Sequence, residues 1–364
     1  MTEPSSKITR ASGPAAEIVL LCNPRAGGRW KELATILDSD EAKHVRRIVT
    51  DSVDDVAPAL EALGREAKLL CIYGGDGTIQ RILDRLPEDR GEALHLALIG
   101  GGTMNVTSRW CGFHDKPADH FRYVVNGYRT GNLLLREVPL LDVTRGTQRL
   151  RGFTFGMGPM VRVLDAFERG SKTKRSAVGL ALKSVVGAWM PIATETRAML
   201  RELNAEVELD GEALPYDAFS ALFANTTGQI NPGIVPFVQE RSRDTFYAAA
   251  YAAPSREVAA ALPMLARGVL PLDAGTMLQR LSPFDRSTER RRLPTDPRYV
   301  NRTASTMVIH TDEPLYTVDG ELLTSDVRRI DVKLGLRLRL AVSPTAALRP
   351  GLRRAAHVVG AVKR

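Results

Sequence analysis

Short apolar runs alternate with helical patterns over the first part of the chain. Continuous apolar runs predict buried strands, and apolar positions repeating every three or four residues predict helices. Expected strands are Ile18–Cys22, Val45–Val49, Lys68–Tyr73 and Leu94–Ile99, and expected helices are Trp30–Leu37, Val53–Leu63, Thr78–Leu86 and Ala118–Val125. Strands separated by helices of this length form βαβ units with right-handed crossovers. The pattern therefore predicts a parallel sheet in an α/β domain.

After Gly131 the pattern changes to longer strand-like stretches with turn residues between them. Asp210-Gly211 and Asp319-Gly320 are typical of two-residue hairpin turns. Expected strands are Glu137–Thr144, Leu150–Phe155, Arg197–Leu209, Ala218–Ala224, Thr245–Tyr251, Ala304–His310 and Arg328–Leu340, and expected helices are Met160–Arg169, Ser176–Trp189, Ser255–Arg267 and the tail Ala346–Arg364. This part is predicted to be a β-rich sandwich domain.

The length of 364 residues also favours two domains. Residues 1–16 are polar and are expected to be a disordered lead-in. We expect the α/β domain at 17–135 and the β-rich domain at 136–341.

Composition narrows the class of protein. Hydrophobic residues make up 44% and charged residues 25%, which excludes a mainly disordered or collagen-like chain. The net charge of +8 favours an anionic partner such as a nucleotide, a nucleic acid or an acidic membrane surface. Cys22 and Cys71 lie in apolar runs and are expected in the core. The sequence shows neither a signal peptide pattern nor an apolar run of roughly 18–20 residues, so we expect a cytoplasmic protein.

Three glycine-rich segments each follow an expected parallel strand. Their sequences are Asn-Pro-Arg-Ala-Gly-Gly at 23–28, Gly-Gly-Asp-Gly-Thr at 74–78 and Gly-Gly-Gly-Thr-Met-Asn at 100–105. Loops that follow parallel strands lie at one edge of the sheet, where ligands of open α/β folds bind. Glycine allows close approach of the backbone, and exposed N–H groups and helix N-termini suit phosphate oxygens. Together the segments predict a site for nucleotide phosphates.

Asp76 indicates how such a site would be used. The segments contain neither a Gly-Lys-Ser/Thr ending nor G-x-G-x-x-G, so a P-loop and a standard NAD site are not expected. A carboxylate in a phosphate-binding loop repels the ligand unless a cation lies between them. Mg²⁺ held by Asp76 and the phosphates resolves this conflict. The alternative is that Asp76 only orders its own turn.

These motifs resemble the diacylglycerol kinase catalytic-domain family, which includes bacterial lipid kinases and sphingosine and ceramide kinases. The matching residues are Asn23-Pro24-x-x-Gly27, Gly74-Gly75-Asp76-Gly77-Thr78, Gly102-Thr103-x-Asn105 and Val318-Asp319-Gly320-Glu321. The resemblance implies transfer of the γ-phosphate of ATP to a lipid hydroxyl of diacylglycerol, ceramide or a sphingoid base. It also implies a cleft between an NAD kinase-like nucleotide domain and a β-rich domain, and a return of residues 342–364 to the first domain.

The resemblance assigns roles to individual residues. Glu321 would take the proton from the lipid hydroxyl, and Asp76 would organise Mg²⁺ and the phosphates. The residues expected to bind ATP are Asn23, Gly27, Gly28, Thr50, Gly74, Gly75, Asp76, Gly77, Thr78, Gly102, Thr103 and Asn105. A second Asp-Gly-Glu at 210–212 competes with Glu321. We favour Glu321 because it follows the late strand pair and precedes the return of the chain.

The sequence departs from the family pattern at several positions. In the third segment Gly100 replaces a proline of the family and Val106 replaces its final aspartate. Bacterial members also carry a segment that binds a structural Mg²⁺. The nearest stretch of this chain keeps the aspartate of that segment, as Asp244, but not its glycine. Asp244 is therefore the candidate second metal ligand, and Asp165 is the candidate residue on the substrate side.

A lipid kinase has to reach a bilayer. Basic residues precede the apolar stretch Ala177–Met190, and further basic residues lie in the tail 349–364. Basic residues attract anionic lipids, and an amphipathic helix adds apolar burial, so we expect peripheral association with the inner face of the membrane. The basic residues before the stretch are Lys172, Lys174 and Arg175. The alternative is a helix packed in the core.

Two other functions remain open from the sequence. One is an NAD kinase-like enzyme with a soluble substrate, and the other is a catalytically decayed protein that binds a nucleotide or a membrane. Nucleic acid is not expected as a partner, because aromatic residues are only 6% and the Arg-rich stretch 285–302 has few stacking side chains. The sequence does not decide between a monomer and a homodimer.

Overall fold

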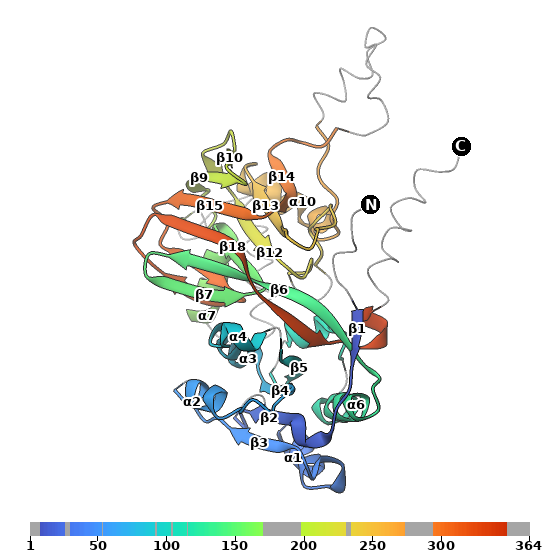
Figure 1. Ribbon diagram of the computed structural model, residues 1–364. Helices are drawn as coiled ribbons and strands as arrows, with labels where there is room; N and C mark the ends of the chain where they lie inside the picture. Colours follow the sequence, from blue (N-terminus) through green and yellow to red (C-terminus); the bar gives the residue numbers. More distant parts are fainter. Residues whose placement is uncertain are drawn as a thin grey trace, which may run out of the picture. The chain divides into compact units, whose positions relative to one another are not determined.

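The computed structural model of the chain divides into two units. The α/β unit comprises Pro4–Leu140 and Gly335–Arg364, and the β-rich unit comprises Leu141–Leu334. The chain passes from one to the other through β6 (Leu133–Arg145) and returns through β18 (Arg329–Ala341) (Figure 1). The division therefore falls inside these two long strands rather than at 135 and 341. The structure describes residues 8–25, 30–52, 54–91, 93–102, 105–114, 116–169, 198–230, 234–273 and 294–347.

A parallel sheet forms the centre of the α/β unit. Its strands β2 (Ile18–Cys22), β3 (Arg46–Val49), β4 (Leu69–Gly74) and β5 (His95–Gly100) lie in the order β5-β4-β2-β3, and all three pairs are parallel. Every residue of β2 and β4 is buried, as expected for continuous apolar runs in a sheet covered on both faces. The parallel α/β architecture predicted from the sequence is confirmed.

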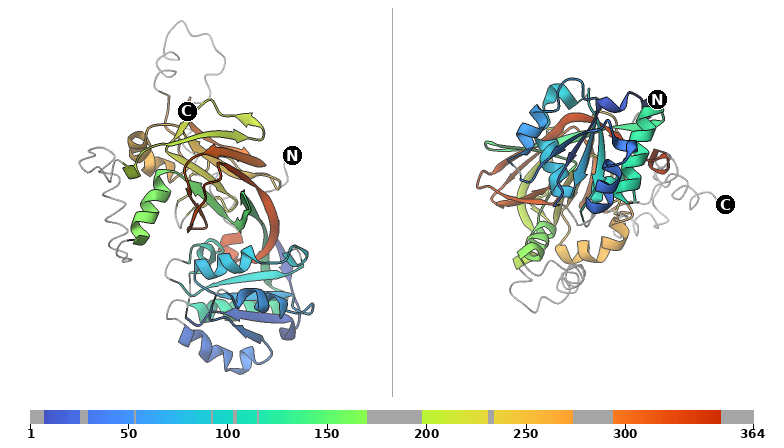
Figure 2. Two further views of the ribbon diagram at one scale, coloured as in Figure 1. Left: turned by 90° about the vertical axis from the view of Figure 1, so that its left-hand side faces the viewer. Right: turned by 90° about the horizontal axis from the view of Figure 1, so that it is seen from below.

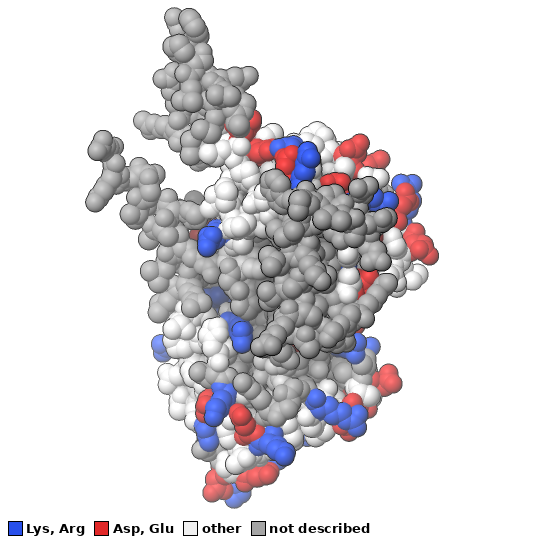
Figure 3. Space-filling model, turned by 180° about the vertical axis from the view of Figure 1, so that it is seen from behind, with Lys and Arg blue, Asp and Glu red and all other residues white. Residues whose placement is uncertain are grey.

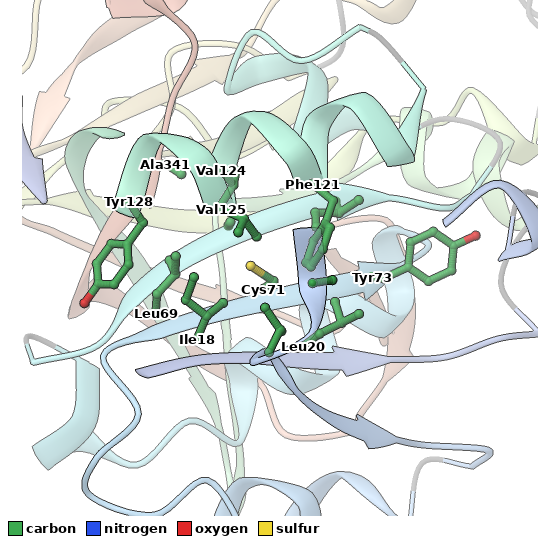
Figure 4. Packing of buried hydrophobic residues seen from close by; sticks show 14 of the residues in the cluster. Ile18, Leu20, Leu69, Cys71, Tyr73, Phe121, Val124, Val125, Tyr128 and Ala341 are labelled. Carbon is green, nitrogen blue, oxygen red and sulfur yellow. The ribbon is translucent and has the colours of Figure 1, made fainter. Parts of the chain in front are cut away.

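Helices cover this sheet and complete its core. They are α1 (Trp30–Leu37), α2 (Val56–Glu61), α3 (Asp76–Asp84), α4 (Glu88–Gly91), α5 (Val106–Trp110) and α6 (Pro117–Arg129). Figure 4 shows Phe121 and Val125 of α6 lying over Leu20 and Cys71 of the sheet. Burial raises the pKa of the Cys71 thiol, so this cysteine is an unreactive core residue.

The N-terminal residues correct one expectation. The sequence predicts a disordered lead-in at 1–16, but Ile8–Ala11 form β1, which pairs antiparallel with β6 so that Ile8 lies opposite Arg136. A 3₁₀ turn, η1 (Ala15–Glu17), follows. Backbone hydrogen bonds to β6 organise β1, and three of its four side chains are exposed. Such a strand has no apolar alternation by which a sequence pattern reveals it.

Two antiparallel sheets make up the β-rich unit. The first contains β7 (Gln148–Gly152), β9 (Leu203–Leu209), β10 (Glu212–Ala213), β11 (Ala218–Phe219), β15 (Thr306–Thr311) and parts of β6 and β18. The second has the order β14 (Tyr299–Ala304), β13 (Phe246–Tyr251), β12 (Ala221–Asn225), β8 (Thr154–Met157), β16 (Leu315–Val318) and β17 (Glu321–Thr324). One core cluster joins Val207 and Ile309 of the first sheet to Phe155 and Ala248 of the second. The predicted β-rich domain is confirmed.

Two helices of this unit are described, α7 (Pro159–Arg169) and α10 (Ser255–Leu265). Val258, Ala261 and Leu265 of α10 pack on Phe223 and Tyr251, so α10 covers the other face of the second sheet (Figure 2). The expected helix at 176–189, the basic residues before it and the tail 348–364 lie outside the described residues.

Two breaks in the strands were not expected from the sequence. The chain bends at Phe153, where it passes from β7 in the first sheet to β8 in the second. It bends again at Ser305, where it passes from β14 in the second sheet to β15 in the first. An aspartate caps each bend, because Asp319 accepts hydrogen bonds from the N–H of Phe153 and Asp210 accepts them from the N–H of Ser305.

The charges do not gather by sign on the face shown in Figure 3, where Lys and Arg side chains lie next to Asp and Glu. None of the helices within the described ranges is long and apolar enough to cross a membrane.

Candidate functional site

The glycine-rich segments leave the parallel sheet at the same edge. Main-chain hydrogen bonds join the chain where the segments begin: the N–H of Asn23 donates to the carbonyl of Tyr73 (3.0 Å), and the N–H of Gly101 donates to the carbonyl of Gly74 (2.8 Å). The N–H of Thr50, after the next strand, donates to the carbonyl of Cys22 (2.9 Å). These bonds extend the sheet beyond the strand ends and hold the starts of the loops side by side.

The structure thus brings most of the predicted nucleotide-binding residues to one edge. They are Asn23, Thr50, Gly74, Gly75, Asp76, Gly77, Thr78, Gly102 and Asn105. Gly27, Gly28 and Thr103 lie outside the described residues. The binding role of each residue stays a prediction.

The second and third segments touch through two glycines. A Cβ atom on Gly102 would lie 2.8 Å from the Cα of Gly75, a distance that real Cβ atoms essentially never show. Because the opposing atom is backbone, it cannot turn aside as a flexible side chain would. Residue 102 has to be glycine for the two loops to approach this closely.

Close packing also explains why residues 100 and 101 of the third segment are glycines. A Cβ on Gly101 would lie 2.6 Å from the ring of Tyr73, and one on Gly100 would lie 2.5 Å from the side chain of Asn105. Gly100 stands where the family has proline, and here the Asn105 side chain lies against it. Tyr73 is fully buried and supports the third loop from the end of β4. Sequence reasoning missed this role of Tyr73, for which the signal is an aromatic residue directly before a glycine-rich loop.

Asp76 ties the second segment to the third. It is the first residue of α3, after the extended residue Gly75 (φ −77°, ψ 171°). Its carboxylate accepts hydrogen bonds from the backbone N–H groups of Thr107, Val106 and Asn105 at the start of α5. Burial raises the pKa of Asp76, and these hydrogen bonds oppose the increase only in part. Asp76 therefore orders a neighbouring loop rather than only its own turn.

Two buried oxygens at this place lack a hydrogen-bond partner among the described residues. They are Oδ1 of Asp76 and Oδ1 of Asn105. Buried polar atoms are nearly always hydrogen-bonded or bound to an ion or water, so these two oxygens indicate a missing partner. Asn105 also has a left-handed backbone (φ 51°, ψ 45°), which is uncommon for a residue other than glycine.

These oxygens fit Mg²⁺, which prefers oxygen ligands and usually takes one or two from the protein and the rest from phosphates and water. Within the described ranges no group of three or more His, Cys, Asp and Glu side chains could hold a metal ion on its own. The site therefore suits a Mg²⁺ ion that arrives with a nucleotide.

One side of the second segment is open. A Cβ on Gly77 would meet nothing within 4 Å, and Gly77 is exposed. Helix α3, which spans nine residues, begins here, and a helix N-terminus attracts anions. Phosphate oxygens can approach the backbone from this side.

Glu321 belongs to the β-rich unit. It is half-buried and lies opposite Val318 in the hairpin of β16 and β17. The two turn residues, Asp319 (φ 51°) and Gly320 (φ 87°), both have positive φ, as a type I′ turn requires. The turn predicted from the sequence is present, and the catalytic role of Glu321 stays a prediction.

The second Asp-Gly-Glu has the same local structure. Asp210 (φ 55°) and Gly211 (φ 80°) form the turn of β9 and β10, and Glu212 follows. Glu212 is exposed and forms a salt bridge with Arg302 (2.8 Å). The two motifs therefore differ in the exposure of the glutamate, because Glu212 is exposed and Glu321 is half-buried.

The residues expected on the substrate side and at a second metal have different surroundings. Asp165 is half-buried on α7. Asp244 is exposed in a turn after Arg241, whose guanidinium donates to the carbonyls of Thr226 (2.9 Å), Ser242 (3.1 Å) and Thr245 (3.2 Å). Because the guanidinium already binds these carbonyl oxygens, the residues present do not fit a second metal ion at Asp244.

Comparison with known proteins agrees with this geometry. Residues 17–132 match the model of the diacylglycerol kinase catalytic domain. No curated protein sequence matches the chain significantly. A diacylglycerol kinase structure from Bacillus anthracis str. Sterne is similar at 18% identity and a TM-score of 0.57, covering 90% of this chain and 98% of that one. A putative diacylglycerol kinase from the same organism is similar at 16% identity and a TM-score of 0.60, covering 92% and 99%. Residues 17–132 are therefore similar to a diacylglycerol kinase catalytic domain, and the chain shares the fold of the two solved structures.

Proposed function

We propose that the protein is an ATP-dependent lipid kinase, which transfers the γ-phosphate of ATP to a hydroxyl group of diacylglycerol, ceramide or a sphingoid base. The observation that carries this proposal is the contact of the second and third glycine-rich segments at Gly75 and Gly102, beside the buried oxygens of Asp76 and Asn105. The family supports phosphoryl transfer, and the names of the family and of the similar structures support a lipid acceptor.

In this proposal the α/β unit binds the phosphates of ATP. Backbone N–H groups of the second and third segments and the N-terminus of α3 supply donors that are already held in place by the sheet. Such preorganised donors stabilise the charge that spreads over the transferred phosphoryl group. The side chains of Asp76 and Asn105 would hold Mg²⁺, and this ion would neutralise part of the phosphate charge.

Glu321 would act as the base that accepts the proton of the lipid hydroxyl. A half-buried carboxylate is suited to this task because it is less hydrated than an exposed one and yet reachable by a substrate. The matching glutamate of the other motif, Glu212, is exposed at the surface.

The lipid substrate requires contact with a bilayer. We propose peripheral association with the anionic inner face of the membrane, as the charge of the whole chain favours. The basic and apolar segments on which the sequence-based expectation rests are not among the described residues.

The test is a phosphorylation assay with the full chain. The protein is incubated with γ-labelled ATP, Mg²⁺ and one acceptor at a time: detergent-dispersed diacylglycerol, ceramide, sphingosine, or NAD in solution. We expect label in at least one lipid after thin-layer separation, and none with the Asp76→Asn variant. Label in NAD alone would establish a kinase for a soluble substrate instead. Binding of ATP without transfer to any acceptor would establish a decayed member of the family.

A further inference from the structure

Large apolar side chains are exposed together in the β-rich unit. Nine large hydrophobic residues are exposed in the described part of the chain, and five of them lie between residues 234 and 272. We call these five residues the apolar patch: Ile234, Val238, Met264, Val269 and Leu272, which are 38–43% exposed. Soluble proteins rarely expose such residues in one group unless the surface binds something.

Backbone contacts hold the patch together. The N–H of Val235 donates to the carbonyl of Ala266 (2.8 Å), so the segment containing Ile234 and Val238 lies against the end of α10. The N–H of Val269 donates to the carbonyl of Met264 (3.0 Å), which brings these two patch residues together where the helix ends. The segments that carry the patch therefore lie side by side.

The patch is not a missing part of the hydrophobic core. Phe237, Val258, Ala261 and Leu265 come from the same segments and point inward, where each is at most 8% exposed. The core beneath is already closed by these residues. The exposed side chains of the patch add nothing to it.

Charge on the outer face of α10 indicates the kind of partner. The exposed residues of this face are Arg256, Ala260, Pro263 and Met264, and Arg267 follows just after the helix. Arginine thus stands at both ends, with apolar residues between them and no acidic residue on this face. Glu257 lies on the half-buried side and pairs with Arg298 (2.9 Å).

Acidic residues close to α10 and to the patch segments do not change this picture. Glu202 accepts a hydrogen bond from the N–H of Ser255 (2.8 Å), the first residue of α10, and is half-buried. Glu240 and Asp273 follow the two segments of the patch, and both interact with other groups of the protein. An apolar surface with arginines at its edges is typical of a helix that lies at an anionic membrane.

We infer that the apolar patch and its flanking arginines, Arg256 and Arg267, dock on the surface of an anionic membrane. The inference rests on the proposed function, because a lipid kinase takes its acceptor from a bilayer. In the docked protein the patch side chains lie among the lipid tails, and the arginines lie at the headgroups.

Vesicle co-sedimentation of the full chain tests the inference. The double variant Met264→Glu/Val269→Glu is compared with the wild type and with Met160→Glu, which changes an exposed apolar residue outside the patch. On vesicles containing phosphatidylglycerol we expect the double variant to bind at least about tenfold more weakly, because burying two apolar side chains contributes more than that factor. Met160→Glu should bind as the wild type does. Equal binding of the double variant and the wild type, or no binding by the wild type, would overturn the inference.

A second variant separates loss of docking from loss of folding. Arg256→Ser/Arg267→Ser leaves the apolar side chains in place, and we expect it to bind phosphatidylglycerol vesicles several-fold more weakly at low salt. Its thermal unfolding should match the wild type. A wild-type dimer that the Met264→Glu/Val269→Glu variant dissociates, with vesicle binding unchanged, would assign the patch to a second copy and overturn the membrane inference.

The kinase assay in detergent distinguishes this inference from the proposed function. Detergent-dispersed lipid requires no docking, so the patch variants should phosphorylate it at the wild-type rate. A wild type that binds vesicles through the patch but phosphorylates no lipid would remove the proposed function and leave the docking surface. An active lipid kinase whose vesicle binding does not depend on the patch would support the proposed function and overturn the docking inference.

Discussion

Gly102 lies so close to Gly75 that a methyl group on the one would lie 2.8 Å from the Cα of the other. The two glycines belong to loops that follow different strands, β5 and β4. Their contact, together with the hydrogen bonds from the start of α5 to Asp76, makes the second and third glycine-rich segments one structural element. A change in either loop is therefore transmitted directly to the other.

The substitution Gly102→Ala should impair catalysis more than folding. The added methyl group has to push the two loops apart, and a displacement of about 1 Å at a site costs roughly 10²-fold in rate. We expect kcat/KM for ATP to fall by about that factor, while the thermal unfolding temperature falls only slightly. Gly77→Ala is the folding control, because nothing lies within 4 Å of its Cβ, and it should unfold as the wild type does. Wild-type kinetics for Gly102→Ala would show that the loop contact does not matter for activity.

The Asp76→Asn variant should lose activity and keep its stability. The amide oxygen can still accept hydrogen bonds from the start of α5, but the charge that would hold Mg²⁺ is gone. Because burial raises the pKa of Asp76, the charged form is disfavoured in the folded protein, and a neutral residue removes that cost. We expect turnover to fall by roughly 10²-fold or more and the unfolding temperature to stay equal or rise. A strong loss of stability would indicate that the aspartate serves mainly to hold α5.

Local pattern was sufficient to predict elements that present a continuous apolar run or face to the core. The expected helix Trp30–Leu37 and strand Ile18–Cys22 have the same bounds in the structure, because each presents an uninterrupted apolar face or run to the core. Helix α5 was missed. It has only five residues and its first N–H groups bond to Asp76, thirty residues away in the chain, so no local propensity specifies it.

Long-range contacts also explain the unexpected strand breaks. The pattern of Leu150–Phe155 predicts one strand. In the structure the carboxylate of Asp319, which is 166 and 165 positions away in the sequence, accepts hydrogen bonds from the N–H groups of Phe153 and Thr154. The glycines of the site could be read from the sequence because their spacing after strands is local. The packing of the Tyr73 ring under Gly101 was missed, because it joins the end of β4 to the loop that follows β5.

The two Asp-Gly-Glu motifs offer a matched pair for testing the base. Both glutamates follow a type I′ turn whose aspartate caps a bend between the sheets, so the local structures are the same. We expect Glu321→Gln to lower turnover by roughly 10²–10⁴-fold, the usual contribution of a general base, with little change in unfolding temperature. Glu212→Gln should retain wild-type turnover, because that carboxylate is paired with Arg302 at the surface. An active Glu321→Gln enzyme would contradict the assignment, and an inactive Glu212→Gln enzyme would point to the other motif.

The cap at Asp210 predicts a pH dependence of stability. Although burial alone would raise the pKa of Asp210, hydrogen bonds from Ser305 and Thr306 lower it below its ordinary value of 3.8. A folded-state pKa below the unfolded one contributes stability that is present above pH 3.8 and is lost as the pH falls through the folded pKa. Denaturant unfolding should therefore show a difference between the wild type and Asp210→Asn near neutral pH that shrinks as the pH falls below 3.8. A difference that is independent of pH would mean that the charge of Asp210 contributes nothing.

Removal of Mg²⁺ should stop the reaction without weakening the fold. In the turn before β13, the guanidinium of Arg241 binds three carbonyl oxygens and is 5% exposed, so a side chain supplies the positive charge there. We expect EDTA to abolish phosphorylation and to leave the thermal unfolding temperature unchanged.

Substitution of Arg241 should lower the stability of the fold, which chelation of Mg²⁺ should leave unchanged. Arg241→Gln removes the charged donor from three carbonyls, of which that of Thr226 is buried. The substitution should reduce the free energy of unfolding by at least about 2 kcal/mol, since hydrogen bonds to a charged group contribute about 1.5–3 kcal/mol each. Arg243→Gln, at an exposed position of the same turn, is the control and should unfold close to the wild type. A fall in the wild-type unfolding temperature on addition of EDTA would show that a metal ion stabilises the protein. This result would contradict the conclusion that the guanidinium of Arg241 supplies the positive charge in this turn.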